Sequence, residues 1–140
     1  MNRLRSAFLG LGLLLAVSAA QAQETAVKAD IPFNFVVGNQ TLPAGEYTVL
    51  NQGAVGQAVL IRSYAGKTAL FASTQPCSSS GPSAKTKLVF HTSSGRYFLY
   101  QIWTEGNSSG RQIPKSRAEV ELAKNGDATG EFILAANLVR

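Results

Sequence analysis

The side chains that most often carry catalysis or bind metals are scarce in this chain of 140 residues. It contains one histidine, His91, and one cysteine, Cys77. Neither a zinc tetrad nor a histidine-based catalytic site can be assembled from one of each within a single chain. The eight acidic residues are dispersed, whereas calcium requires a tight cluster of oxygen ligands. We therefore expect no metal, no cofactor and no catalytic residue, and we interpret His91 as a half-buried or hydrogen-bonded structural residue.

The residue types of a serine hydrolase are present, because the chain contains many serines, His91 and several acids. The G-x-S-x-G motif of a nucleophile elbow is missing from the sequence, and the serines concentrate in segments of turn composition. Nothing selects two glutamates as a glycosidase pair, and Glu119 with Glu121 is explained by helix capping and solvent exposure. The sequence thus favours a protein that is not an enzyme, with a small periplasmic hydrolase as a weaker alternative.

Surface recognition is the chemistry for which the residue types are best suited. Two tyrosines and a tryptophan lie within seven positions and precede a polar loop, Glu105–Arg111. Rings edged by amide and guanidinium groups can stack on a sugar or a peptide. The alternative is that the same rings belong to the core. The predicted ligand-binding residues are Tyr97, Tyr100, Trp103, Asn107 and Arg111.

The first 22 residues have the pattern of a cleaved signal peptide. Arg3 and Arg5 precede the apolar run Ala7–Val17, and Ala20-Gln21-Ala22 is an A-x-A cleavage site. The apolar run is much shorter than the roughly 20 residues that span a bilayer. We therefore predict export to the periplasm or the cell exterior, with a single β-rich domain over Gln23–Arg140 and no integral membrane segment after cleavage.

Charge and cysteine content limit the partners and the covalent links. Without Arg3 and Arg5 the chain keeps 11 of its 13 basic residues against 8 acidic ones, so its formal net charge falls from +5 to +3. These charges are scattered, which argues against nucleic acid as a partner. A lone cysteine allows no disulfide within the chain. Cys77 lies in Gln75–Ala84, a Ser, Gly and Pro-rich run predicted to be an exposed loop, and pairing between chains is left open.

The apolar periodicity predicts about seven short strands. The clearest pair is Lys87–Trp103, a hairpin around the turn residues Thr92–Gly95, whose second strand is apolar on both faces. Thr25–Val37 alternates with a period of two, and Pro32 places it at or near a sheet edge. The remaining expected strands are Glu46–Asn51, Gln57–Ser63, Lys67–Thr74 and Gly130–Val139.

One segment near the C-terminus is ambiguous between helix and strand. Ser116 and Glu119 have capping-box spacing, and Asn125-Gly126 is a stop signal, so Arg117–Lys124 is predicted as one short helix. The rival interpretation is a strand in which Val120 and Leu122 alternate with glutamates. The whole pattern indicates an all-β domain, either an antiparallel β-sandwich or a small barrel. An eight-stranded outer-membrane barrel is disfavoured because the segments are short and several are apolar on both faces.

Two stretches carry a resemblance to known sequences. They are IPFNFVVGNQTLPAGEYTV, which starts at Ile31, and RYFLYQIWTEGNSSGRQIPKSRAEVELA, which starts at Arg96, with LVFH between them. The chain resembles a group of small, β-rich, signal-peptide-bearing hypothetical proteins of acidobacteria. The resemblance covers most of the predicted mature chain. It implies export and the same domain boundaries, and it transfers no catalytic residue.

Taken together, these observations predict an exported, non-catalytic β-sandwich module with a binding or structural role at the cell envelope. Its expected partner is an envelope component, either a protein or a carbohydrate. A different possibility is self-assembly, in which Thr25–Val37 adds as a strand to the sheet edge of another copy.

Overall fold

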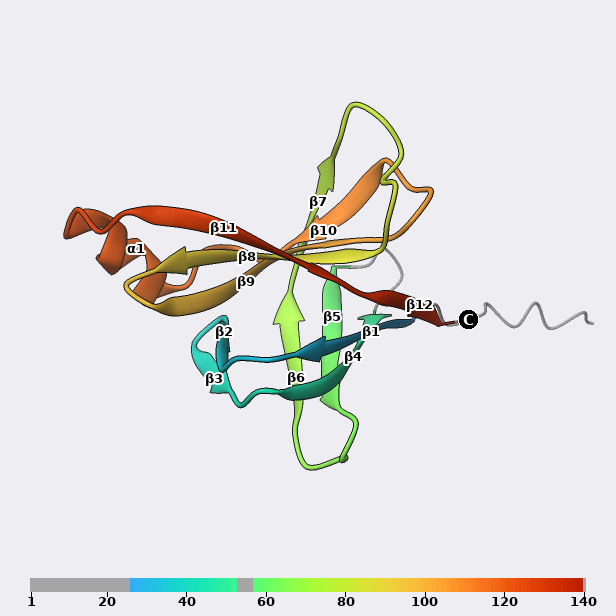
Figure 1. Ribbon diagram of the computed structural model, residues 1–140, viewed down its shortest axis with the longest axis horizontal. Helices are drawn as coiled ribbons and strands as arrows, with labels where there is room; N and C mark the ends of the chain where they lie inside the picture. Colours follow the sequence, from blue (N-terminus) through green and yellow to red (C-terminus); the bar gives the residue numbers. More distant parts are fainter. Residues whose placement is uncertain (1–25, 53–56, 140) are drawn as a thin grey trace, which may run out of the picture.

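The computed structural model describes residues 26–52 and 57–139. The predicted signal peptide, residues 1–22, lies outside them. The described chain forms two β-sheets and one short helix, and the sheets do not close into a barrel (Figure 1). The strands are β1 Ala26–Ile31, β2 Phe35–Val37, β3 Gln40–Leu42, β4 Gly45–Gln52, β5 Ala58–Ser63, β6 Ala69–Ser73, β7 Gln75–Ser78, β8 Lys87–Ser93, β9 Arg96–Trp103, β10 Ser109–Gln112, β11 Thr129–Ala135 and β12 Asn137–Val139.

The first sheet has the strand order β12-β1-β4-β5-β6, and the second has the order β11-β8-β9-β10-β7. Neighbours along these paths are antiparallel. The small strands β2 and β3 join the second sheet through a parallel bridge between Val36 and Phe98. This arrangement confirms the predicted β-sandwich with one short helix near the C-terminus.

The described residues form twelve strands and not the expected seven or so, because the chain switches sheets at three places and because β3 and β10 were not expected as strands. β10 includes the end of the expected polar loop Glu105–Arg111. The Thr25–Val37 segment divides into β1 in the first sheet and β2 in the second. The chain also changes sheet between β6 and β7 at Thr74, and between β11 and β12 at Ala136. A strand that switches sheets forms a corner of the sandwich while its apolar alternation continues, so the sequence period does not reveal the break.

Two further expectations about strands are corrected by the pairing. β1 is an interior strand between β12 and β4, not an edge strand. Pro32 is compatible with this position because it follows the last residue of β1, where no ladder N–H is required. Cys77 belongs to β7, which pairs with β10, and the thiol is half-buried instead of lying in an exposed loop.

The hairpin of β8 and β9 is confirmed, with a tighter turn than expected. Thr92 and Ser93 are still part of β8, and the turn consists of Ser94 and Gly95 alone. Both have positive φ, +50° and +73°. This is the form of a two-residue turn whose twist matches that of the flanking strands, and glycine adopts it without strain.

A β-bulge interrupts the alternation of β9. Val89 and Phe90 of β8 lie opposite Gln101 and Leu99, so Tyr100 is the additional residue of β9. Leu99 and Ile102 consequently both belong to the core between the sheets. The largest fully buried side chains of this core include Tyr47, Phe35 and Phe90. The Tyr47 hydroxyl satisfies its hydrogen-bonding capacity by donating to the Pro43 carbonyl at 2.7 Å.

Helix α1, Arg117–Lys124, settles the ambiguity near the C-terminus in favour of the helix. Ser116 is the N-cap, and its hydroxyl oxygen accepts a hydrogen bond from the Glu119 backbone N–H at 3.1 Å. Lys124 lies in the last turn, where a positive charge is favoured by the helix dipole.

Candidate functional site

The outer face of the second sheet holds the polar groups that are most closely organised by the fold. Helix α1 contacts this face beside His91. The segment between β7 and β8 lies at Trp103. Side chains of β8, β9 and β11 form the floor between these two coverings.

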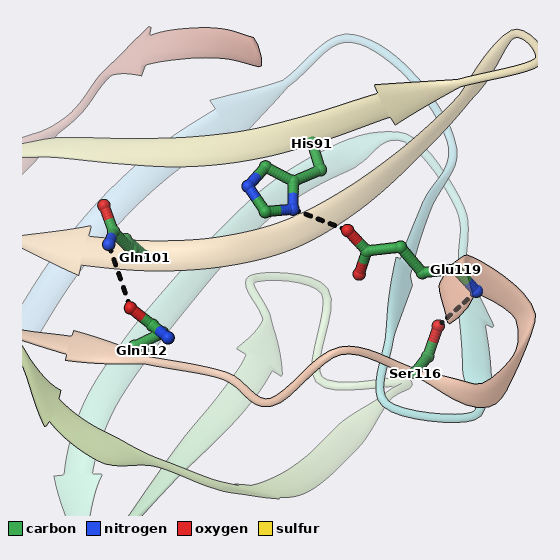
Figure 2. Close-up of polar contacts among 5 residues, drawn as sticks. All are labelled: His91, Gln101, Gln112, Ser116 and Glu119. Atoms are coloured by element: carbon green, nitrogen blue, oxygen red, sulfur yellow. Dashed lines mark hydrogen bonds and ion pairs between the residues drawn. The ribbon is translucent and has the colours of Figure 1, made fainter. Parts of the chain in front are cut away.

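At the helical end, His91 and Glu119 form a close pair (Figure 2). The distance from His91 Nδ1 to Glu119 Oε1 is 2.5 Å, and the side chains are only 13% and 8% exposed. Tyr100 stacks on the imidazole, with ring centroids 3.7 Å apart. The bulge places Tyr100 on this face, so the strand irregularity and the helix cap together build the environment of His91.

This pair confirms that His91 is hydrogen-bonded and corrects the interpretation of Glu119 as solvent-facing. The expected cap involves the Glu119 backbone N–H, but the carboxylate is buried against His91 and does not face solvent. The two residues are 28 positions apart. No local spacing rule connects them, although a lone histidine on a strand face and a capping glutamate were both visible in the sequence.

At the opposite end, three side chains form a hydrogen-bonded chain. The Trp103 indole Nε1–H donates to Gln101 Oε1 at 3.1 Å, and Gln101 Nε2 donates to Gln112 Oε1 at 3.1 Å (Figure 2 shows the two glutamines). Because an indole can only donate, the oxygen of Gln101 must face Trp103, and its NH₂ group is directed to Gln112. The chain fixes the side-chain orientations across β9 and β10.

The indole ring of Trp103 packs directly against Gly110, which has no side chain. A Cβ on Gly110 would lie 2.8 Å from two carbons of the indole ring and 2.9 Å from the Ile102 carbonyl oxygen. The ring therefore occupies space that only glycine leaves open. Trp103 retains only 7% of its exposure, so its ring faces are covered by the protein.

A groove of about 430 Å³ lies between these features, lined in part by the segment that connects β7 and β8. Three backbone hydrogen bonds of 2.9 Å tie that segment to the loop after β9. The Ser79 N–H donates to the Ser108 carbonyl, the Ser83 N–H donates to the Asn107 carbonyl, and the Gly106 N–H donates to the Ser83 carbonyl. Lys87 and Glu131 are the charged residues of the lining, and Gln101 and Trp103 contribute to the floor. Ser79, Ser80 and Ser83 also contribute to the lining.

The five predicted ligand-binding residues do not form one surface. Tyr97 faces the inner side, where its ring stacks on Phe33 with centroids 3.7 Å apart. Tyr100 lies beneath His91 on the outer side, and Trp103 is buried in the groove. The alternative that the rings belong to the packed interior therefore describes Tyr97 and Trp103 well.

Asn107 and Arg111 lie in a different place, a cavity of about 180 Å³ between the two sheets. Its described lining includes the core residues Val27, Val49 and Ile102. The Asn107 side-chain amide donates to Thr104 Oγ1 at 2.6 Å. The structure thus brings Asn107 and Arg111 together and separates them from all three rings.

No protein-family model, curated protein or solved structure matches this chain. Within residues 26–52 and 57–139, no helix is long and apolar enough to cross a membrane. The same residues contain no cluster of three or more histidine, cysteine, aspartate or glutamate side chains arranged to hold a metal ion.

Proposed function

We propose that the protein is an exported, non-catalytic β-sandwich module that binds an envelope component in the groove on the outer face of its second sheet. The observation that carries this proposal is the groove itself, which has a hydrogen-bonded floor and a wall held by backbone hydrogen bonds. A site whose polar groups are already held in place binds with a smaller loss of conformational entropy than a mobile one.

The chemistry of the lining favours a neutral ligand rich in hydrogen-bonding groups. Lys87 and Glu131 contribute opposite charges, so a strongly anionic or cationic ligand would meet one like charge. Serine hydroxyls and the Gln101 amide can donate and accept hydrogen bonds. A carbohydrate of the cell envelope has this character. The buried Trp103 side chain forms part of the groove wall, but its ring faces are not open for stacking on a ligand.

Trp103 also provides the assay, because it is the one tryptophan of the chain. Titration of neutral envelope oligosaccharides into the purified protein should change the emission of Trp103. The double variant Lys87→Ala/Glu131→Ala should lose binding, whereas Glu121→Ala, on the exposed face of α1, should retain it. Binding that leaves the emission unchanged and tolerates the double variant would place the ligand elsewhere and contradict the proposal.

The alternative of self-assembly through the N-terminal strand meets a specific structural obstacle. Within its own chain, β1 pairs with β4 along its whole length and with β12 at Ala26–Lys28. Addition of this strand to another copy would first require it to leave β12 and β4. Sedimentation velocity across a range of concentrations tests this alternative, because a strict monomer excludes it.

The small-hydrolase alternative and the export step are tested separately. A hydrolase that uses His91 would show turnover in a broad substrate screen, and His91→Ala would abolish that turnover. Cleavage after Ala22 predicts that N-terminal sequencing of the exported protein starts at Gln23.

A further inference from the structure

The outer edge of β6 has a row of backbone groups that the described chain leaves open. β6 is the last strand of the first sheet and pairs only with β5 there. Backbone hydrogen bonds join Thr74 to Gln57 and Ser63 to Thr68. In an antiparallel ladder, residue pairs that exchange backbone hydrogen bonds alternate with pairs that do not. Between the Gln57–Thr74 and Ser63–Thr68 pairs, the hydrogen-bonded pairs are therefore Val59 with Ala72 and Ile61 with Leu70. The N–H and C=O groups of Ala69, Phe71 and Ser73 therefore point away from β5.

This edge lacks the features that usually prevent pairing with another chain. Folded proteins protect open edges with charged side chains, proline or bulges. The sequence of β6 is ALFAS, and its register with β5 is regular. Phe71 in its centre is 67% exposed. Among the other outermost strands of the two sheets, β11 carries the charged residue Glu131 and β7 contains Pro76.

The edge of β6 also borders a groove of about 540 Å³. One wall is Leu70–Ser73 of β6, and the others are 37–40 and 113–117. Lys115 and Arg117 project from the last of these segments, and both are exposed. Neither is within ion-pair distance of any carboxylate in the described part of the chain. No acidic side chain is present among the described residues of the lining, so the groove has an uncompensated positive charge.

From these observations we propose that the groove binds an extended, acidic polypeptide segment of a partner, which adds to β6 as a further strand. The backbone of the partner would pair with Ala69, Phe71 and Ser73. Its apolar side chains would contact Leu70 and Ile113, and its carboxylates would face Lys115 and Arg117. Strand addition supplies affinity through the main chain, and the side-chain environment selects the sequence. Here the selection is electrostatic, since two unpaired cations lie along one wall.

The test uses capped eight-residue peptides that alternate valine with glutamate, and the same peptides with lysine in place of glutamate. In the free protein, the amides of Ala69, Phe71 and Ser73 should exchange with solvent faster than those of Leu70 and Ala72. The glutamate peptide should protect the three fast amides, and it should bind at least about tenfold more tightly than the lysine peptide.

Two variants separate the backbone contribution from the charge contribution. Phe71→Pro removes an outward N–H that takes no part in the ladder, so the fold should persist while binding is lost. Phe71→Ala keeps that N–H, so the glutamate peptide should still slow the exchange of the outward amides of β6. Should the proline variant not fold, Lys115→Glu/Arg117→Glu keeps the test intact, since reversing both charges should reverse the preference between the peptides.

Three results would overturn the proposal. One is a glutamate peptide that leaves the three amides unprotected, and another is equal affinity for the two peptides. The third is concentration-dependent dimerisation with protection of the same amides in the absence of peptide, which would make the groove an interface between copies. None of these results depends on the groove of the second sheet, so the proposed carbohydrate site is tested independently.

Discussion

His91 Nδ1 lies 2.5 Å from Glu119 Oε1, and this contact joins helix α1 to the outer face of the second sheet. Both side chains are largely removed from solvent. His91 and Glu119 are 28 positions apart, and bringing them together has an entropic cost. The contact and the Tyr100 ring stacked on His91 help to offset this cost. The pair is therefore a point at which a single substitution should loosen the helix without disturbing the core between the sheets.

The first prediction concerns this pair. Glu119→Ala or His91→Ala should lower the free energy of unfolding by about 1–3 kcal/mol, because the remaining partner keeps a buried polar group without its hydrogen bond. Urea denaturation measures the change. The double variant should cost less than the sum of the two single variants. Glu121→Ala is the control and should stay within about 0.5 kcal/mol of the natural protein. Additive losses would show that the two side chains act independently.

The second prediction concerns Gly110. Gly110→Ala should destabilise the fold by about 1–3 kcal/mol, because the new methyl group overlaps the indole of Trp103 and the Ile102 carbonyl. The emission of Trp103 should change together with the stability. Gly81→Ala is a matched control, since a Cβ there meets no atom within 4 Å. Equal behaviour of the two variants would contradict the described position of the indole.

The third prediction concerns alkaline pH. Burial raises the pKa of Tyr47 above its ordinary value of 10.0. The unfolded chain therefore loses this proton first, so the contribution of Tyr47 to stability is complete below pH 10 and decreases as the pH rises above it. Denaturation at a series of alkaline pH values should show the loss. Tyr47→Phe should be less stable at neutral pH by about 1 kcal/mol, the value of the hydrogen bond to Pro43.

That variant should also lose less stability between pH 9 and pH 11 than the natural protein. An identical pH dependence of the two proteins would show that Tyr47 does not titrate during unfolding. Tyr64 is 72% exposed, so Tyr64→Phe serves as the control for removal of a tyrosine hydroxyl from the surface.

The fourth prediction concerns the thiol. Burial is the largest influence on Cys77, and it raises the pKa of the thiol above its ordinary value. Since the thiolate is the reactive form, iodoacetamide should modify the folded protein at pH 8 more slowly than the urea-unfolded chain. Mass spectrometry over time measures both rates. Equal rates would show that β7 does not shield the thiol.

Much of the architecture follows from local signals. Alternating apolar residues predict the strands, Ser94 and Gly95 lie within the expected hairpin turn, and Ser116 with Glu119 marks the start of α1. These features depend on residues that are close in the chain, since a turn, a cap and a strand period are each defined within a few positions. The fold class and the short helix were predictable for this reason.

The candidate sites depend on contacts that no local pattern encodes. The bulge at Tyr100 reverses the alternation of side chains along β9. Tyr97 and Trp103 therefore lie on opposite faces of the sheet, although an even number of positions separates them in the sequence. His91 meets Glu119 only because the chain returns across the outer face after β10. The open edge of β6 exists because the chain leaves the first sheet at Thr74. Sequence periodicity specifies which residues are apolar, whereas the register between strands and the packing of distant segments determine which of them meet.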